Sequence, residues 1–212
     1  MTVDAVDLDE LERDALTELV NIGVSRAAAS LRKMVSKEVL LSVPSVEIVT
    51  RKSAASLINQ RESEALIAVQ QQFDGPFSGR ALLIFPQSNG VSLVRAIVGD
   101  DMAEAELLDM EDEALAETGN VILNGCLGSM ANMLQHSLKM SIPDVRRGDS
   151  SLLFESYNGS TDGSFVLFLY INFSVRDRNI RGYIAMIMDL PSLEKLKQLI
   201  SNFIERVMNE TD

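Results

Sequence analysis

The chain has 212 residues, 46% of them apolar and 24% charged, so it can bury a substantial core and does not have the composition of a disordered protein. Its net charge of −12 would repel phosphate backbones and anionic lipid, which argues against nucleic acid or a membrane surface as a partner. One cysteine and one histidine exclude an internal disulfide, a cysteine-based zinc site and a histidine-cluster metal site.

The N-terminal segment is acidic and lacks the apolar core of a signal peptide. No apolar run approaches the length that a membrane span needs. We therefore expect a cytoplasmic protein.

In the first half, a long amphipathic helix is predicted over residues 8–34, with apolar side chains on one side and a polar stripe on the other. A β-branched segment over 37–50 contains Pro44, which predicts an edge strand or a strand broken at that residue. Further elements follow along the chain: strands 65–73 and 77–85 joined by the turn Asp74-Gly75-Pro76, a helix over 88–98 ended by Gly99, and an acidic linker over 100–109.

The second half repeats this order. The pattern predicts a helix over 110–136, a strand over 139–145 that contains Pro143, strands over 164–173 and 182–188, and a closing helix over 192–208. Two related halves, 8–99 and 109–208, thus follow one another in one chain.

The repeat extends to individual residues. A shift of 99 positions places Glu18 on Glu117, Asn21 on Asn120 and Pro44 on Pro143, and the shift grows to 103 where Gly79 meets Gly182. Each half is small for a core of its own, so we expect a single domain over residues 1–212. The predicted fold is α/β of the α+β type, with pseudo-two-fold helix–strands–helix halves that share one sheet and long helices packed on it.

A pair of polar residues is duplicated on the two long helices. Glu18 and Asn21 are three positions apart and therefore leave the same helix face, and Glu117 and Asn120 do the same. A carboxamide offers a donor and an acceptor and can hold a water for attack, while a carboxylate can bind a lysine or arginine of a partner. The alternative is that these residues only form a solvent-facing polar surface. The pairs offer too few carboxylates for a metal site, so a partner would have to bring any metal.

These residues carry a family resemblance. ERDALTELVNIG with SVPSVEIV, and MEDEALAETGNVI with SIPDVRRG, resemble the two copies of the [Asp/Ser]-x3-Glu-x2-Asn-x22-Pro motif of the CheC/CheX/FliY phosphatases of bacterial and archaeal chemotaxis. Residues 79–86, GRALLIFP, and the helix after them resemble the first half of CheC. The two copies match the CheC architecture, because CheX has one.

The resemblance implies a phosphatase that removes the phosphoryl group from the aspartyl phosphate of a CheY-like response regulator. Glu18 and Glu117 would contact a lysine of the receiver domain, and Asn21 and Asn120 would orient the attacking water. The receiver would supply Mg²⁺ and the phosphorylated aspartate, so the chain would need no cofactor of its own. Some CheC proteins also bind the deamidase CheD, which is a second expected partner.

Four further positions belong to the motif. Asp14 occupies its first position in copy one, whereas copy two departs from the pattern with Glu113, and Pro44 and Pro143 are expected to shape the following strand. The residue before the asparagine is Val20 in one copy and Gly119 in the other, and we expect its size to affect how closely a receiver approaches. Both sites are expected to be competent.

Other readings remain open. A non-catalytic module that binds CheD, or that acts in the flagellar switch as FliM does, is the main alternative, and it would gain if the protein itself covered the Glu/Asn faces. A structural duplicate without a partner is a weaker reading. An internal pseudo-dimer has less need of a second chain, so we expect a monomer. Cys126 is predicted to be a core thiol, and His136 to complement the C-terminal dipole of the second long helix.

Overall fold

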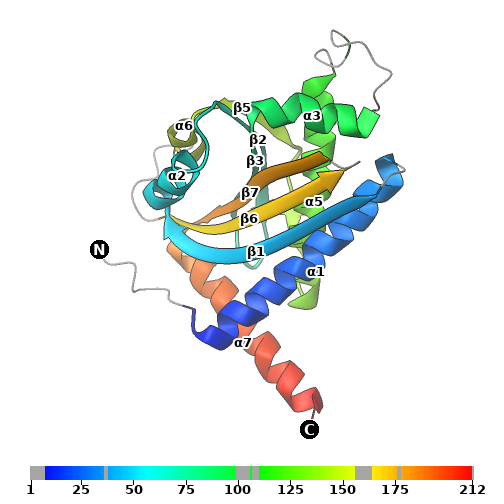
Figure 1. The fold of residues 1–212 in the computed structure, drawn as a ribbon. Coiled ribbons are helices and arrows are strands. Elements are labelled where there is room, and N and C mark those ends of the chain that lie inside the picture. The colour runs from blue at the N-terminus through cyan, green and yellow to red at the C-terminus, as the bar shows by residue number, and fades with distance from the viewer. Residues whose placement is uncertain are drawn as a thin grey trace.

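The computed structural model describes residues 8–35, 38–98, 106, 110–155, 164–175 and 178–211. Within this part of the chain, the centre is a seven-stranded antiparallel sheet in the order β1-β6-β7-β3-β2-β4, with β5 also paired to β2. Figure 1 shows that this sheet is curled. The strands are β1 (Val39–Thr50), β2 (Leu66–Asp74), β3 (Gly79–Pro86), β4 (Lys139–Met140), β5 (Asp144–Gly148), β6 (Phe165–Val175) and β7 (Arg178–Met188).

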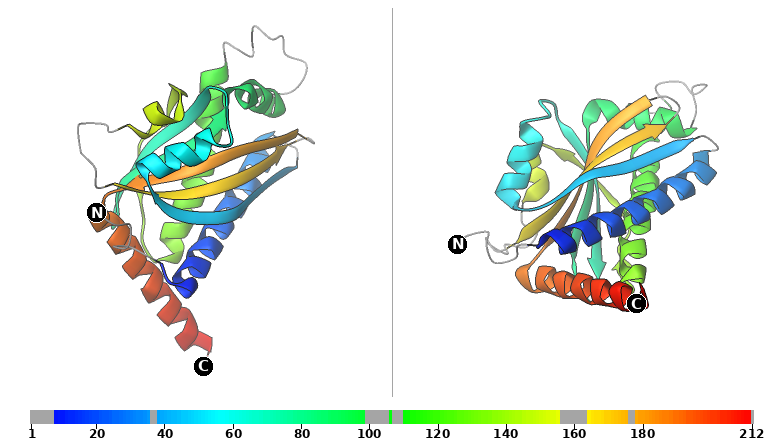
Figure 2. Two further views of the ribbon diagram at one scale, coloured as in Figure 1. Left: turned by 60° about the vertical axis from the view of Figure 1, so that its left-hand side comes forward. Right: turned by 60° about the horizontal axis from the view of Figure 1, so that its bottom comes forward.

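The helices divide between the two faces of the sheet (Figures 1 and 2). The two long helices pack against each other and against one face, and the main apolar core lies there, around Leu19, Leu83 and Leu123. The short helices α2 and α6 contact each other on the opposite face, over a second cluster that includes Ile58 and Phe168. The helices are α1 (Glu10–Val35), α2 (Arg51–Asn59), α3 (Gln87–Val98), α5 (Glu111–Met133), α6 (Ser150–Phe154) and α7 (Leu190–Thr211).

The strand order contains the predicted pseudo-two-fold relation. Exchanging β1 with β5, β6 with β2 and β7 with β3 reverses the order and leaves the pairing unchanged. The central pair obeys it residue by residue, because Arg80 faces Ile187, and a shift of 103 positions turns this pair into Ile84 and Tyr183, which also face each other. The fold class predicted from the sequence is therefore confirmed, with one shared sheet.

The two halves exchange their edge strands. β1 of the first half pairs with β6 of the second, and β5 of the second half pairs with β2 of the first. Each half thus completes the hydrogen-bonding edge of the other. The sequence pattern contains no signal for this exchange.

The long helices approach closely where small residues meet. A Cβ added to Gly23 would lie 2.7 Å from the carbonyl oxygen of Cys126, and a Cβ added to Gly125 would lie 2.7 Å from the Cβ of Ala27. Backbone atoms can come this near only where a side chain is missing. The contact fixes α1 and α5 side by side, so the polar stripes of both helices belong to one rigid unit.

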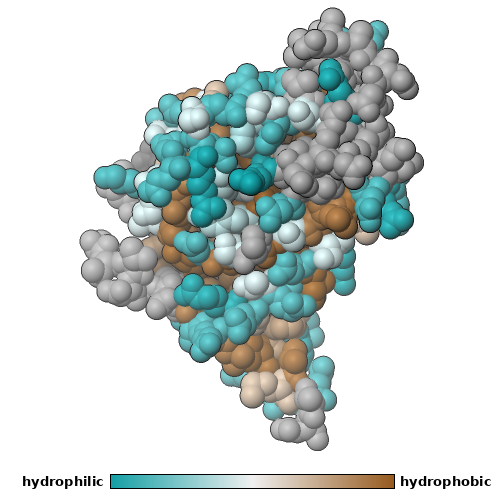
Figure 3. Space-filling model, viewed as in Figure 1, coloured by the Kyte–Doolittle hydropathy of each residue, from teal (hydrophilic) through white to brown (hydrophobic). Residues whose placement is uncertain are grey.

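A buried carboxylate anchors the start of α1. Glu12 and Asp9 form a capping box, in which the Glu12 N–H donates to Asp9 Oδ1 over 2.8 Å and the Asp9 N–H donates to Glu12 Oε2 over 3.1 Å. The same carboxylate accepts from Ser201 Oγ and lies 3.2 Å from Lys197 Nζ, both on α7. Glu12 therefore ties α1 to α7. The C-terminal part of α7 carries the exposed Val207 and Met208. Figure 3 shows an apolar area at the lower end of the molecule.

Several expectations need correction. The predicted strand over 139–145 is two short strands, β4 and β5, because the chain leaves the ladder between Met140 and Asp144, where Pro143 lies. Helices α2 and α6 were not predicted, although each has a capping residue, Thr50 or Asp149, that accepts from the backbone N–H three positions later. The acidic linker over 100–109 lies outside the described residues except Glu106.

Candidate functional site

The acidic members of both polar stripes face solvent. Asp14 and Glu18 are exposed on α1, and Glu113 and Glu117 are exposed on α5. The opposite sides of the same helices are buried in the main core. The described part of the chain therefore leaves the glutamate side of both helices uncovered, which is the arrangement that contact with another molecule requires. The asparagine of each pair, Asn21 or Asn120, is half-buried one helical turn further on.

Asn21 is held by a bulge in the neighbouring edge strand. The register between β1 and β6 shifts between Ser42 and Ser45, where Pro44 lies. At this bulge the N–H of Val43 donates to Asn21 Oδ1 over 3.3 Å. A proline cannot donate to a ladder and is tolerated at such a bulge, so the spacing from Asn21 to Pro44 places a free N–H beside the asparagine.

Asn120 is held by side chains instead. Gln71 Nε2, on β2, donates to Asn120 Oδ1 over 3.0 Å, and Asn124 Nδ2 donates to the same oxygen over 2.6 Å. Gln71 Nε2 also donates to the Ser141 carbonyl over 2.7 Å, close to the break between β4 and β5 at Pro143. The sequence analysis did not single out Gln71 or Asn124. A glutamine at an inward position of an apolar strand was the available signal for Gln71.

The residue before each asparagine faces the sheet and not a partner. Val20 is fully buried, and a Cβ added to Gly119 would lie 2.4 Å from Cγ1 of Val69 on β2. Neighbouring helix positions point about 100° apart, so the residue before a half-buried asparagine at the edge of the buried side turns inward. The expectation that these residues set the approach of a receiver is therefore wrong.

Cys126 and His136 were the other two residues singled out from the sequence. Cys126 is fully buried against α1, and burial raises the pKa of its thiol to about 12, so it is a core thiol as predicted. His136 is exposed beyond the end of α5, where its backbone N–H donates to the carbonyl of Ala131. Among the described residues, no group of three or more histidine, cysteine, aspartate or glutamate side chains could hold a metal ion. The described helices also include none long and apolar enough to cross a membrane.

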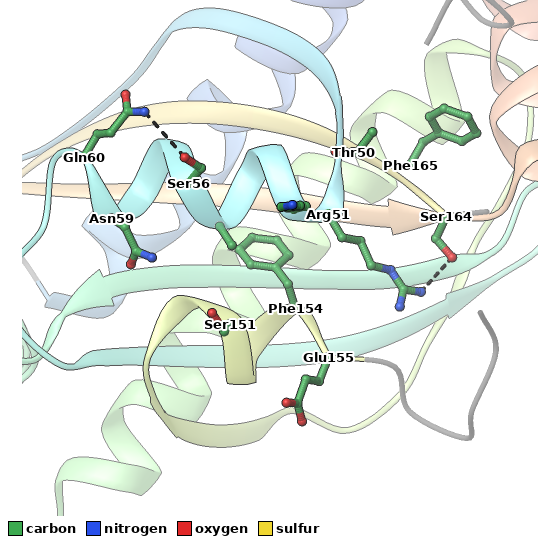
Figure 4. Close-up of a pocket in the computed structure, with 12 residues that line it drawn as sticks. Thr50, Arg51, Ser56, Asn59, Gln60, Ser151, Phe154, Glu155, Ser164 and Phe165 are labelled. Atoms are coloured by element: carbon green, nitrogen blue, oxygen red, sulfur yellow. Dashed lines mark hydrogen bonds between the residues drawn. The ribbon is translucent and has the colours of Figure 1, made fainter. Parts of the chain in front are cut away.

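A pocket on the other face of the sheet lies away from the polar pairs. It has a volume of about 770 Å³ between α2, α6 and the nearby ends of β1 and β6 (Figure 4). The Arg51 guanidinium lies in it and donates to Ser164 Oγ over 2.6 Å. Because α2 and α6 cover the face of the sheet opposite α1 and α5, this pocket is separate from both asparagines.

Comparison with known proteins agrees with the motif. The model of the CheC-like family matches residues 11–48, which contain the first Glu/Asn pair and Pro44. The flagellar motor switch phosphatase FliY of Bacillus subtilis is 28% identical over 141 residues, which are 66% of this chain and 36% of FliY. The CheY-P phosphatase CheC of the same organism is 21% identical over 141 residues, 65% of this chain and 67% of CheC.

The chain is thus similar in sequence to CheC and FliY, over the first motif copy for the family model and over about two thirds of its length for the two relatives. A solved structure agrees on the fold: that of Thermotoga maritima FliY superposes with a TM-score of 0.71 at 18% identity, covering 93% of this chain and all of that one. The sequence match to the curated FliY spans about a third of that protein's length. Since the family model covers the first motif copy alone, the second copy rests on the internal repeat and on the geometry around Asn120.

Proposed function

We propose that this protein hydrolyses the aspartyl phosphate of a CheY-like response regulator. The observation that carries the proposal is the duplicated pair of a solvent-facing glutamate and an anchored asparagine, on two helices locked side by side. The names of the relatives support the reaction, because CheC of Bacillus subtilis is a CheY-P phosphatase and FliY a motor switch phosphatase.

In this proposal the glutamates fix the docking of the partner. Glu18 and Glu117 are exposed carboxylates on a chain of net charge −12, and either can bind a lysine of the receiver domain. A charge pair at the edge of an interface sets register and the rate of encounter more than affinity. Loss of either glutamate should therefore slow association of that site with the receiver.

The asparagines act on the water. Asn21 or Asn120 would enter the receiver's active site and orient a water in line with the phosphorus atom. The water oxygen forms the new bond to phosphorus as the bond to the aspartate oxygen breaks, so the products are inorganic phosphate and free aspartate. The amide takes no proton, because a carboxamide is no base at neutral pH, and its contribution is positioning. The receiver supplies Mg²⁺, which would neutralise charge on the phosphoryl oxygens.

The test is phosphate release from a phosphorylated receiver with Mg²⁺, for the wild type, Asn21→Ala, Asn120→Ala and the double variant. Each single variant should keep the turnover of its intact copy, and the double variant should lose roughly 10²–10³ of the acceleration, by analogy with the loss of one catalytic hydrogen-bond donor. Asn132→Ala is the matched control, since Asn132 is exposed on α5 outside the motif. Thermal unfolding of every variant checks that the fold survives.

Two outcomes oppose the proposal. A double variant as active as the wild type would reject the amide mechanism. If no receiver loses phosphate faster with the wild type, the binding-module alternative takes its place, and binding of purified CheD becomes the next measurement.

A further inference from the structure

The two asparagines share one orientation but reach it by different means. In both copies the carboxamide oxygen accepts a hydrogen bond from the protein, from the Val43 N–H at Asn21 and from Gln71 and Asn124 at Asn120. The first copy thus uses one backbone group at 3.3 Å, and the second uses two side-chain amides at 3.0 Å and 2.6 Å. The second asparagine depends on side chains that mutation can remove.

The direction of the Gln71 amide follows from its other partner. The Ser141 carbonyl can only accept, so the group 2.7 Å from it must be the NH₂ end of Gln71. The second N–H of this nitrogen then meets Asn120, which must present its oxygen. The Nδ2 of Asn120 is consequently turned away from Gln71, as the end of the carboxamide that the second site can offer to another molecule.

Packing does not require an amide at this position. Gln71 is 1% exposed between the core residues Val69 and Phe73, and within the described chain its Oε1 is buried without a hydrogen-bond partner. A buried carbonyl oxygen without a hydrogen bond destabilises the folded state, so the amide of Gln71 costs stability that an apolar side chain would not.

The position that corresponds to Gln71 in the other half of the molecule holds an apolar residue. Gly79 pairs with Phe73 and its counterpart Gly182 pairs with Ile171, so Gln71, two residues before Phe73, corresponds to Leu169. Leu169 is fully buried in the same core. Leucine therefore satisfies the packing of this position, and the glutamine is explained by its contact with Asn120.

We propose that Gln71 is a positioning residue of the second site, which holds the Asn120 carboxamide with its oxygen inward and its NH₂ group toward the receiver. The inference rests on the proposed phosphatase function. It gives Gln71 no contact with phosphate or water, and it makes the presented NH₂ the group that donates to the attacking water or to a phosphoryl oxygen.

The kinetic test uses the Asn21→Ala background, so that turnover reports the second site alone. Gln71→Leu should lower kcat about tenfold, because a loosened catalytic group loses its pre-set orientation, while KM for the phosphorylated receiver stays the same. Gln72→Leu is the matched control, since Gln72 is exposed on the same strand and its side chain points to the other face. An unchanged kcat in Gln71→Leu would overturn the inference.

Gln71→Glu separates positioning from packing. The ionised carboxylate has no donor, so the Asn120 amide should turn its NH₂ group inward and activity should fall. Burial favours the protonated acid, which regains one donor, so part of the activity should return as the pH is lowered. This pH profile is measured against that of the Asn21→Ala parent, and a variant whose activity follows the parent's profile at all pH values would oppose the proposal.

A measurement without turnover keeps this inference distinct from the proposed function. The order of the Asn120 side-chain NH₂ group can be followed by ¹⁵N relaxation in the free protein. It should be high in the wild type and fall in Gln71→Leu, but not in Gln72→Leu. If it stays unchanged, Gln71 does not position Asn120, whether or not the protein is a phosphatase. If it falls while the wild type fails to release phosphate, the proposed function is rejected, whereas the contact by which Gln71 positions Asn120 still stands.

Discussion

Replacing Gly119 by alanine tests how the site helix is seated on the sheet. A Cβ at this position would lie 2.4 Å from Cγ1, 2.5 Å from Cβ and 2.8 Å from Cγ2 of Val69. Val69 cannot move aside easily, because β2 is paired with Leu83 of β3 on one side and with Val145 of β5 on the other. The alanine must therefore push α5, and Asn120 with it, away from the sheet.

The magnitude follows from two opposing terms. Overpacking of this kind costs about 1–3 kcal/mol. Alanine returns about 1 kcal/mol of helix propensity relative to glycine. With three contacts shorter than any real Cβ makes, the upper part of the cost applies, and we expect a net loss of about 1–2 kcal/mol in the free energy of unfolding. For a chain of this size that corresponds to a fall in Tm of roughly 2–8 °C.

The assay is urea unfolding followed by circular dichroism, with Gly128→Ala as the matched control on the same helix. A Cβ at Gly128 meets nothing within 4 Å, so this variant should gain about 0.5–1 kcal/mol. In a Val69→Ala background the cost of Gly119→Ala should become smaller, because Cγ1 and Cγ2 of residue 69 are gone while its Cβ, 2.5 Å from the added Cβ, remains. The reasoning is refuted if Gly119→Ala is as stable as the wild type, or if both glycine variants shift in the same direction.

Two further predictions concern buried ionisable groups. Burial raises the pKa of the Cys126 thiol to about 12, against about 8.5 in an unfolded chain. The contribution of this thiol to the free energy of unfolding is therefore fully present below about pH 8.5, and it is lost as the pH rises toward 12. Cys126→Ala lacks this dependence, so its stability deficit in urea unfolding should narrow between about pH 9 and 11, and a constant deficit would contradict the assignment. Glu12→Ala removes the carboxylate that accepts from the Asp9 N–H in the capping box and that contacts Lys197 and Ser201, and should cost about 1–3 kcal/mol in thermal unfolding. Glu10→Ala, an exposed position in the same turn, should cost far less, and equal losses would show that the buried contacts of Glu12 contribute nothing.

Much of the local structure could be predicted because the spacing of apolar residues indicates helices and strands. The long helices over 10–35 and 111–133, the hairpin around Asp74-Gly75-Pro76 and the closing helix all follow helical or alternating patterns. The missed helices α2 and α6 span 9 and 5 residues, too few turns for a periodic pattern to stand out. Their capping residues were the only local signals.

The candidate site divides in the same way. Glu18, Asn21, Glu117 and Asn120 could be singled out because the repeat duplicates their spacing, and helix geometry alone places each pair on one face. Helix geometry also makes Val20 and Gly119 point away from the glutamates. Only the structure shows that the sheet lies on that side of the helices, so that both residues face it.

The sequence by itself determined the long helices, most of the strands, the internal duplication and the Glu/Asn pairs, because each depends on residues a few positions apart or on a fixed shift along the chain. Only the tertiary structure decided that the halves exchange edge strands, and that Gln71, 49 residues from Asn120, holds its carboxamide. Strand partners and buried hydrogen bonds join residues that are distant in the chain. Many partners satisfy a strand edge or an amide equally well, and the packing of the whole core selects one of them.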